Sequence, residues 1–249
     1  MNLLDKIKKR LQGTATIEET NAEQAYDIWA LNYDVQPDNL ILALDETLFK
    51  SLVEKVTIKD KVIADIGCGT GRHWKKIFDK EPQQLYGFDV SAGMLEKLKQ
   101  KYPQAKVAQL KDNTLPGLQN ESCDVIVSTL TMAHIEHLEE ALQEWNRVLK
   151  PGGTLIITDY HPDNLAKGGQ RTFSHDNKTI AVKSHVHPIT QVNEYCNRLH
   201  LNISEFKEIT IDETMKHYYE KQHALHVYEK YKGSVVIYGM LLKKEHAAS

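Results

Sequence analysis

The segment at residues 64–71, with the sequence ADIGCGTG, most constrains how this chain folds. The apolar run at 62–66 is typical of a buried parallel strand, and the glycines after it let the backbone turn sharply and approach a ligand without Cβ clashes. Asp89 closes a second strand-like run, LYGFD at 85–89. A carboxylate in that place is positioned to accept hydrogen bonds from the two hydroxyls of a ribose. The segment therefore predicts a nucleoside-binding βαβ unit.

The spacing of the glycines indicates which nucleoside is expected. Dinucleotide sites usually carry G-x-G-x-x-G, with the pyrophosphate on a helix N-terminus. Here Gly67, Gly69 and Gly71 form G-x-G-x-G, and Asp65 precedes them. A carboxylate there would repel a pyrophosphate but suits a ligand that carries an ammonium group. S-adenosylmethionine has both an ammonium and a sulfonium group, so the pattern favours it over a dinucleotide.

With these residues the chain resembles the class I S-adenosylmethionine-dependent methyltransferases, whose first motif is typically D-x-G-x-G-x-G with an acidic residue ending the next strand. Later segments of the chain extend the resemblance, which covers about residues 60–160. Asp112 and Asn113 follow a strand-like run at 107–110, and a fourth strand-like run lies at 123–128.

The segment at 145–157, WNRVLKPGGTLII, has the pattern of a helix, a Pro-Gly-Gly stop and a strand. This phrase is frequent in methyltransferases related to the ubiquinone/menaquinone biosynthesis C-methyltransferases and to the malonyl-carrier-protein O-methyltransferases. The resemblance implies an α/β fold with a Rossmann-like, mostly parallel seven-stranded sheet, helices on both faces and an N-terminal helical lid. It also implies that the last strand inserts antiparallel between the fifth and sixth.

Periodicity and punctuation predict the elements. The expected helices lie at about 22–35, 39–55, 71–80, 92–102, 137–150 and 188–200. The expected strands lie at about 61–66, 84–89, 105–110, 123–129, 154–160, 203–212 and 234–243. We expect a single methyltransferase domain over 1–249, with a lid region at 1–58 and an insertion at 162–187 that forms a hairpin or flap over the active-site edge.

The resemblance implies a cofactor site on the glycine loop, with Asp89 on the ribose and Asp112 and Asn113 at the adenine. The expected cofactor-binding residues are Tyr33, Asp65, Gly67, Cys68, Gly69, Gly71, Asp89, Val90, Met94, Asp112, Asn113 and Ser128.

Methyl transfer mainly requires the acceptor to be held about 3 Å from the methyl group with water excluded. A histidine near neutral pKa is the usual general base where one is needed. His134 follows the fourth strand and His187 lies in the insertion, so both are the candidate catalytic residues. The expected acceptor-binding residues are Tyr26, Trp29, Tyr160, His161 and His175.

Tyr26, Trp29 and Tyr33 recur at i, i+3 and i+7, a spacing typical of a stripe packed on a core. In related methyltransferases a similar segment forms a lid over the cofactor, and both interpretations stay open. The histidines of the insertion allow a second comparison. His185 and His187, with Asp159 or Asp163, could form a metal site, but solvated or pocket-lining histidines are commoner, so we expect no metal.

The formal net charge of −3 and the absence of an uncompensated Lys/Arg tract disfavour a nucleic-acid partner. Three scattered cysteines fit a reducing cytoplasm. The basic amphipathic segment at 1–10 favours a lid or surface helix over membrane association. We expect a monomer or homodimer.

Together these features predict methyl transfer from S-adenosylmethionine to an oxygen or carbon atom of a small-molecule metabolite. No Asp-Pro-Pro-Tyr or Asn-Pro-Pro-Tyr motif follows the fourth strand, which disfavours amino-methylation of nucleic-acid bases. A cofactor-binding protein with non-methylating chemistry or a scaffold role remains an alternative. An NAD(P)-dependent oxidoreductase fits less well, because Asp65 and the glycine spacing count against it.

Overall fold

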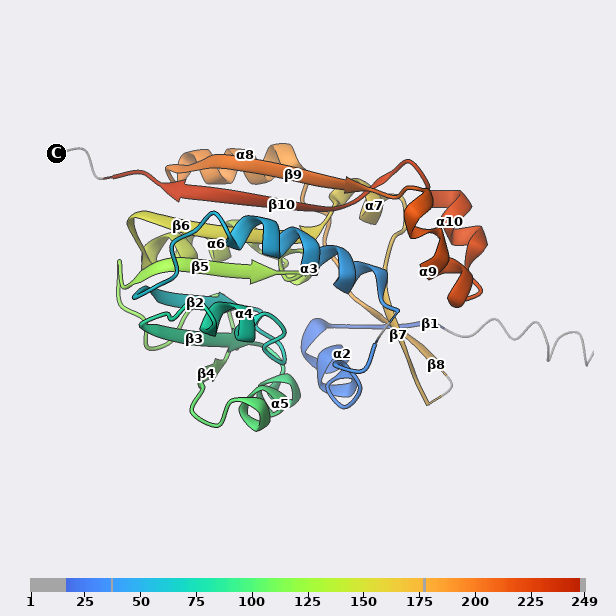
Figure 1. Ribbon diagram of the computed structural model, residues 1–249, viewed down its shortest axis with the longest axis horizontal. Coiled ribbons are helices and arrows are strands. Elements are labelled where there is room, and N and C mark those ends of the chain that lie inside the picture. Colours follow the sequence, from blue (N-terminus) through green and yellow to red (C-terminus); the bar gives the residue numbers. More distant parts are fainter. Residues whose placement is uncertain (1–16, 37, 177, 247–249) are drawn as a thin grey trace, which may run out of the picture.

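The computed structural model describes residues 17–36, 38–176 and 178–246, so the basic segment at 1–10 lies outside the described residues. A seven-stranded sheet with the order β4-β3-β2-β5-β6-β10-β9 forms its centre (Figure 1). Its strands are β2 (Val62–Ile66), β3 (Gln84–Asp89), β4 (Lys106–Gln109), β5 (Cys123–Thr129), β6 (Leu149–Tyr160), β9 (Leu201–Thr210) and β10 (Val235–Lys244). Strand β10 pairs antiparallel with both β6 and β9, which confirms the predicted sheet and the place of its last strand.

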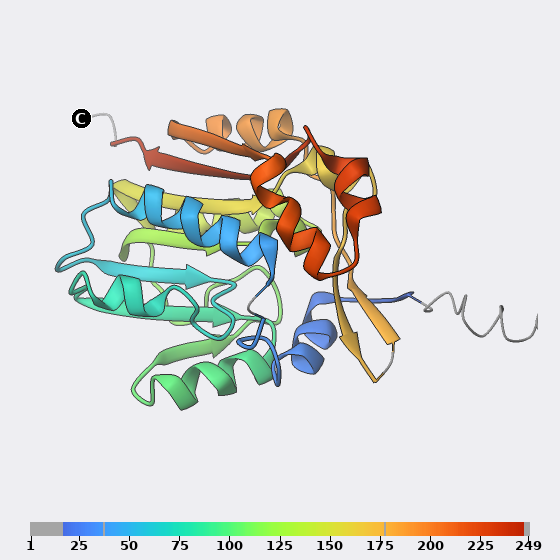
Figure 2. The ribbon, with the colours of Figure 1, turned by 45° about the vertical axis from the view of Figure 1, so that its right-hand side comes forward.

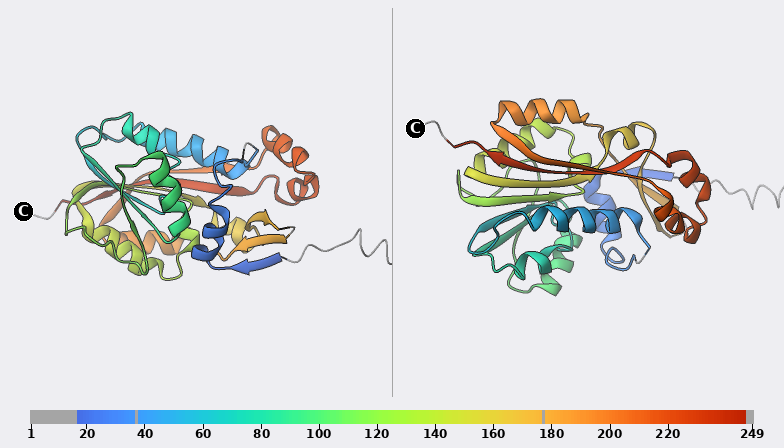
Figure 3. Two further views of the ribbon diagram at one scale, coloured as in Figure 1. Left: turned by 90° about the horizontal axis from the view of Figure 1, so that it is seen from below. Right: turned by 45° about the horizontal axis from the view of Figure 1, so that its top comes forward.

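Helices cover both faces of this sheet (Figure 3). One core lies under α3 (Leu40–Val53), α4 (Trp74–Phe78) and α5 (Ala92–Lys101), and the other under α6 (Leu138–Val148) and α8 (Ile189–Arg198). Each core buries one tryptophan completely, Trp74 in the first and Trp145 in the second. No helix in the described part of the chain has the length and apolar character needed to cross a bilayer.

A second, three-stranded sheet stands beside the carboxyl ends of the parallel strands (Figure 2). It consists of β1 (Ile17–Thr20), β7 (Arg171–His175) and β8 (Lys178–Val182), and it packs against α2 (Ala22–Trp29); α7 (Pro162–Ala166) lies instead against β10. β7 and β8 form the hairpin predicted within 162–187, and β1 pairs parallel with β8. The N-terminal lid region and the insertion are therefore hydrogen-bonded to one another.

Several predicted boundaries are wrong. The helix expected at 22–35 ends at Trp29, and turns follow it. The helix expected at 71–80 covers only α4, because the chain makes turns after the positive φ of Gly71. Strand β6 begins at Leu149 rather than near 154, since Leu149 pairs with Cys123 before a register shift.

The sequence pattern also missed the elements between the last two strands. Three short segments lie there, η2 (Glu213–Met215), α9 (Lys216–Lys221) and α10 (Leu225–Tyr231). α10 buries Tyr228 and Tyr231 against the first core. The missed elements are short, and short helices carry little periodic signal. The division of the chain into one domain with a lid and a flap stays a prediction.

A buried ionic cluster joins α3 to the segment before α4. Asp45 accepts hydrogen bonds from Arg72, from Thr158 and, at 2.8 Å, from His73 Nε2. Burial alone would raise the pKa of Asp45, but the Arg72 guanidinium and the His73 bond hold it below its usual range. This cluster fixes the helix that follows the glycine loop.

Candidate cofactor and acceptor site

The glycine loop turns directly above the end of β3. The backbone N–H groups of Gly67 and Cys68 both donate to the Phe88 carbonyl, at 2.7 and 3.0 Å. Gly67 has φ +73°, and a Cβ there would overlap the Thr131 side chain. Gly69 has φ +52°, and no atom lies within 4 Å of the place a Cβ would take. The loop thus leaves open space on its outer side, which only glycine preserves at this backbone conformation.

Asp89 stands at the end of β3 and faces the same space. Its Oδ2 accepts from the Gly69 N–H at 2.7 Å and its Oδ1 from the Ser91 N–H at 2.9 Å. The side chain is only 7% exposed, and burial raises the pKa of Asp89 to about 6 although both backbone bonds favour the ionised form. Each oxygen keeps a further lone pair for a ligand hydroxyl.

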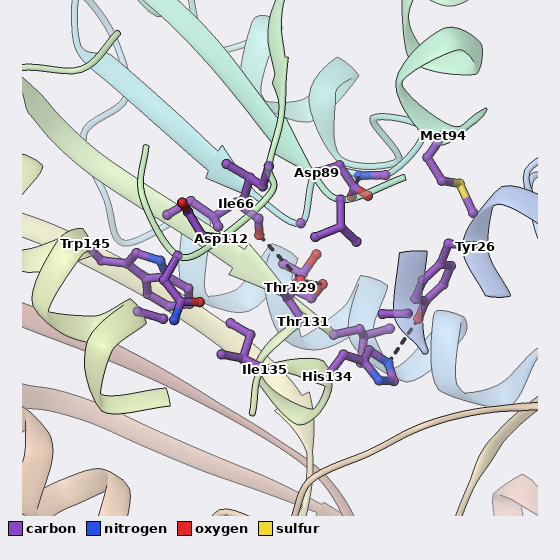
Figure 4. Close-up of a pocket in the computed structure, with 18 of the residues that line it drawn as sticks. Tyr26, Ile66, Asp89, Met94, Asp112, Thr129, Thr131, His134, Ile135 and Trp145 are labelled. Atoms are coloured by element: carbon purple, nitrogen blue, oxygen red, sulfur yellow. Dashed lines mark hydrogen bonds between the residues drawn. The ribbon is translucent and has the colours of Figure 1, made fainter. Parts of the chain in front are cut away.

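A pocket extends from the glycine loop in two directions (Figure 4). At one end Asp112 and Trp145 gather with apolar residues of the neighbouring elements. At the other end Tyr26 and His134 are turned toward one another. The described residues that line the pocket are Ala22, Tyr26, Tyr33, Ile66, Gly67, Gly69, Asp89, Val90, Met94, Leu110, Asp112, Asn113, Thr129, Leu130, Thr131, His134, Ile135, Ala141 and Trp145.

The hydrogen bonds of His134 fix its tautomer. Nδ1 lies 3.0 Å from the Lys183 carbonyl, which only accepts, so Nδ1 carries the proton. Nε2 therefore accepts from the Tyr26 hydroxyl at 3.1 Å. Burial lowers the pKa of His134 to about 4, so the imidazole is neutral at pH 7. His134 thus acts as a hydrogen-bond acceptor that points at the lid.

Carboxylates of the lid region anchor it to the sheet. Asp27 accepts from the Ser91 hydroxyl at 2.6 Å and from the Gly93 N–H at 2.9 Å. Asp34 accepts from the Thr70 hydroxyl at 2.6 Å and from Lys101. These bonds hold the segment at 27–34 against the start of α5 and, through Thr70, against the glycine loop.

Four of the expected cofactor residues support the pocket from behind instead of lining it. Asp65 accepts from the Trp74 indole at 2.8 Å, and burial raises the pKa of Asp65 to about 7. Cys68, Gly71 and Ser128 also lie outside the lining, and the buried Ser128 hydroxyl has no partner. Tyr33, Val90, Met94, Asp112 and Asn113 do line the pocket.

The expected acceptor residues are dispersed. Tyr160 and Trp29 line a second cavity of about 560 Å³. His161 lines neither the pocket nor this cavity. Both of its ring nitrogens are engaged elsewhere, since Nδ1 accepts from the Asp163 N–H and Nε2 donates to Glu208. His175 lines a third cavity of about 410 Å³, which Trp29 also lines, and lies next to Asp176.

His187 lies in a separate, small cavity and does not line the pocket. Its Nε2 donates to the Ile135 carbonyl at 2.7 Å, which fastens the insertion to the loop after β5. The metal site considered from the sequence does not form here. The ring centres of His185 and His187 are 6.3 Å apart, and the Asp159 carboxylate accepts hydrogen bonds from the backbone N–H groups of Ala133 and Tyr160. Within 17–36, 38–176 and 178–246, no three His, Cys, Asp or Glu residues gather as metal ligands would.

Sequence reasoning missed several residues of the site. Thr129, Leu130 and Thr131 line the pocket directly after β5, a position that the topology alone could have indicated. Arg171, in contrast, lies buried among Tyr26, Trp29 and Tyr33. No sequence motif around Arg171 indicates this position.

Comparisons with known proteins give the class of this site. Residues 64–157 match the family model of the methyltransferase domain. A ubiquinone/menaquinone biosynthesis C-methyltransferase of Campylobacter jejuni is 32% identical over 117 residues, which cover 45% of this chain and 48% of the relative. The chain thus spans about half the length of this curated relative.

Solved structures share the fold. An S-adenosylmethionine-dependent methyltransferase from Mesorhizobium loti aligns with a TM-score of 0.61 at 14% identity, over 78% of this chain and 95% of its own. The [4+2]-cyclase SpnF aligns with a TM-score of 0.68 at 17% identity, over 94% and 99%. The family match thus identifies a methyltransferase domain in residues 64–157, and the solved structures show that the described chain has the fold of S-adenosylmethionine-dependent methyltransferases. Both findings support S-adenosylmethionine as the cofactor.

We predict that Asp89→Ala weakens binding of S-adenosylhomocysteine, the demethylated cofactor, at least tenfold. The change removes a charged acceptor for the ribose hydroxyls, and a hydrogen bond to a charged group contributes about 1.5–3 kcal/mol. Titration calorimetry measures the affinity, and Asp79→Ala, an exposed carboxylate on the surface, is the matched control. Unchanged affinity in Asp89→Ala would contradict the ribose assignment.

The same carboxylate gives binding a pH dependence. Ligand hydroxyls favour ionised Asp89, whose pKa is about 6 in the free protein. Affinity should therefore be level above pH 7 and fall roughly tenfold between pH 7 and pH 5. Asp89→Asn should bind weakly without this fall. A fall that persists in Asp89→Asn would assign the titration to another group, such as Asp65.

Proposed function

We propose that the protein transfers a methyl group from S-adenosylmethionine to an oxygen or carbon atom of a small-molecule metabolite. One observation carries this proposal. The glycine turn, the buried Asp89 and the lid tyrosines Tyr26 and Tyr33 face a single pocket. The second cavity lies next to it, because its wall residue Trp29 packs on Tyr33 of the pocket. A cofactor and an acceptor then have separate, adjacent places.

The pocket residues fit the cofactor. The open space over Gly69 admits the methionine part, and the two lone pairs left on Asp89 match the ribose hydroxyls. Asp65 lies behind the loop, where its pKa of about 7 leaves it only partly ionised at neutral pH. A nearby ammonium group would favour its charged form without direct contact. Tyr33, Val90 and Met94 complete this part of the wall in our assignment.

The other end of the pocket suits adenine. Asp112 Oδ1 accepts from the N–H and the hydroxyl of Thr114, so Oδ2 is left for the exocyclic amine. Leu110, Ile135 and Trp145 supply apolar surface for the ring. In this proposal the Asn113 backbone N–H donates to the ring.

When bound, S-adenosylmethionine supplies an electrophilic methyl group: the acceptor's electron pair forms the new bond and the carbon–sulfur pair goes to sulfur. The chain's own residues position the acceptor and exclude water. The lid is anchored by Asp34 to Thr70 of the glycine loop and by Asp27 to Ser91, and Tyr26 of the lid contacts His134 in the segment after β5. Positioning of this kind contributes a large part of such rate enhancements.

We assign His134 primarily to orienting the acceptor or Tyr26. An imidazole with a pKa of about 4 is a weak base at neutral pH. His187 is proposed to act through the Ile135 carbonyl, which it holds in place beside the pocket. Tyr26, Trp29 and Tyr160 face the acceptor in this proposal, whereas His161 and His175 line neither the pocket nor the second cavity, which does not support such a role for them.

A small-molecule acceptor, rather than nucleic acid, fits the net charge of −3. We further propose a cytoplasmic location, because the three cysteines are free and buried, and a monomer or homodimer without membrane attachment.

Non-methylating chemistry is the second candidate. The observation that favours it is the likeness in fold to SpnF, which is described as a [4+2]-cyclase. Such a protein would use the same pocket and consume no cofactor.

The two candidates are separated by incubating the protein with S-adenosylmethionine and pooled metabolites. We expect S-adenosylhomocysteine to form together with a product heavier by one CH₂, detected by mass spectrometry, and Asp89→Ala to form neither. A product without mass gain would support the second candidate. Absence of cofactor binding, or tight NADH binding instead, would overturn the assignment.

Once that screen has identified the acceptor, His134→Ala and His187→Ala should each lower kcat/KM roughly tenfold or more. Affinity for S-adenosylhomocysteine should change less than about threefold, because neither imidazole is assigned to the cofactor. His200→Ala, at an exposed histidine, is the control. Equal losses in both quantities would assign these histidines to the cofactor or to stability, and full activity would leave positioning by other groups as the mechanism.

A further inference from the structure

Arg171 is a buried cation without an acidic partner. The residue is 3% exposed, and no carboxylate of the described residues lies within 4.0 Å of its guanidinium. Nη1 donates to the Tyr160 hydroxyl at 3.2 Å and Nη2 to the Tyr33 hydroxyl at 3.1 Å. Nε is buried and has no hydrogen-bond partner among the residues that the structure describes. Buried charges in proteins are normally paired, so this arrangement is unusual.

Aromatic rings hold the guanidinium without neutralising it. Its central carbon lies 4.8 Å from the Trp29 ring centre, 5.7 Å from that of Tyr33 and 5.9 Å from that of Tyr26. Trp29 is itself stacked on Phe173, with ring centres 4.4 Å apart. These contacts favour a cation and fix its orientation. The rings and hydroxyls carry no net charge at neutral pH, so the positive charge remains.

Arg171 forms part of the wall of the second cavity, which has about 560 Å³ of space. Lys230 is a second basic residue in that wall, and no Asp or Glu is among the described residues that line it. The remaining wall is mixed: apolar and aromatic side chains such as Ile211, Val227 and Tyr231 alternate with the uncharged polar groups of Asn39, Asn164, Gln170, Thr172 and Gln222. The cavity therefore suits a negatively charged molecule that presents both apolar and polar surface.

The neighbouring pocket has the opposite character. Asp89 and Asp112 are its charged residues among those described, and the proposed cofactor adds a sulfonium cation. Tyr26 and Tyr33 line that pocket and also contact Arg171, so the guanidinium lies close to the reaction site. Two like charges in a water-poor site repel each other strongly unless an anion lies near both.

We propose that the methyl acceptor carries a carboxylate and that Arg171 binds it from the wall of the second cavity. The unused Nε–H and the remaining Nη–H groups offer the fork that carboxylates accept in bidentate geometry. The inference rests on the proposed function and adds the chemical class of the acceptor. Arg171 is then a specificity-determining residue of the acceptor site.

The test uses wild-type protein saturated with S-adenosylhomocysteine and three matched pairs of probes: acetate and acetamide, phenylacetate and phenylacetamide, octanoate and octanamide. Affinities are measured by ligand-observed NMR. At least one carboxylate should bind tenfold or more tightly than its amide. If no carboxylate of the panel binds more tightly than its amide, or if inorganic phosphate alone binds, the inference is overturned.

Arg171→Gln should abolish the preference for the carboxylate while S-adenosylhomocysteine affinity changes less than threefold. Arg198→Gln makes the same change at an exposed arginine of α8 and should leave both quantities unchanged. If Arg171→Gln does not fold, as judged by circular dichroism, Arg171→Lys keeps the charge but loses the fork, and the preference should fall several-fold. A preference that persists in every folded variant overturns the inference.

Two further outcomes separate the alternatives. Arg171 could instead bind the carboxylate of the cofactor. In that case Arg171→Gln weakens the binding of S-adenosylhomocysteine at least tenfold but leaves the binding of 5′-methylthioadenosine, which lacks the amino-acid part, unchanged. This result overturns the acceptor assignment. Failure of the wild type to bind S-adenosylhomocysteine contradicts the proposed function, whereas binding without a carboxylate preference contradicts only the present inference.

Discussion

The carboxylate of Asp89 is the interaction on which the site depends. It accepts the N–H of Gly69 in the loop after β2 and the N–H of Ser91 at the start of α5. The Ser91 hydroxyl in turn donates to Asp27 of the lid. One side chain at the end of β3 therefore shapes the glycine turn, starts the next helix and seats the lid. Hydrogen bonds to an ionised acceptor are roughly twice as strong as neutral ones, so a single buried charge can carry this arrangement.

The first part of the lid region, at 22–36, packs outside the two cores that flank the sheet, whereas α3 belongs to the first core. Trp29 and Ala30 form a small apolar cluster with Met94. Other contacts of 22–36 include hydrogen bonds that water can replace, such as that between Asp34 and Thr70. Segments with few buried apolar contacts open locally at a small fraction of the global free energy of unfolding. Entry of a cofactor needs only such a local opening.

Much of this architecture could be predicted because its signals are local. The run before Gly67, the acid at the end of the next strand and the Pro-Gly-Gly turn each reflect neighbouring residues, and the sheet follows from them. The pairing of β1 with β8 and the turn after Trp29 depend on residues far apart in sequence, so no pattern within the lid announces them. The aromatic stripe illustrates the limit, since Tyr26 lines the pocket while Trp29 packs on Phe173.

The histidines show the same limit at the level of chemistry. The sequence made both His134 and His187 candidate catalytic residues, but His134 contacts Tyr26 at the pocket, whereas His187 donates to the Ile135 carbonyl. Arg171 is the only arginine of the insertion and stands among polar residues, so its burial in an aromatic group follows from the β7–β8 hairpin and the lid together. Sequence patterns locate a carboxyl edge, whereas the fold decides which side chains reach it.

Arg171 and His134 together explain how the proposed transfer proceeds without a strong base. A neutral hydroxyl must lose a proton as it is methylated, and an imidazole with a pKa of about 4 takes that proton poorly at neutral pH. An acceptor that arrives ionised has no proton to lose. Where the ionised group is itself the atom that is methylated, its negative charge disappears as the new bond forms, and a site poor in water favours that loss of charge. In such a site the Arg171 guanidinium binds the anionic acceptor, and the neutral His134 orients it.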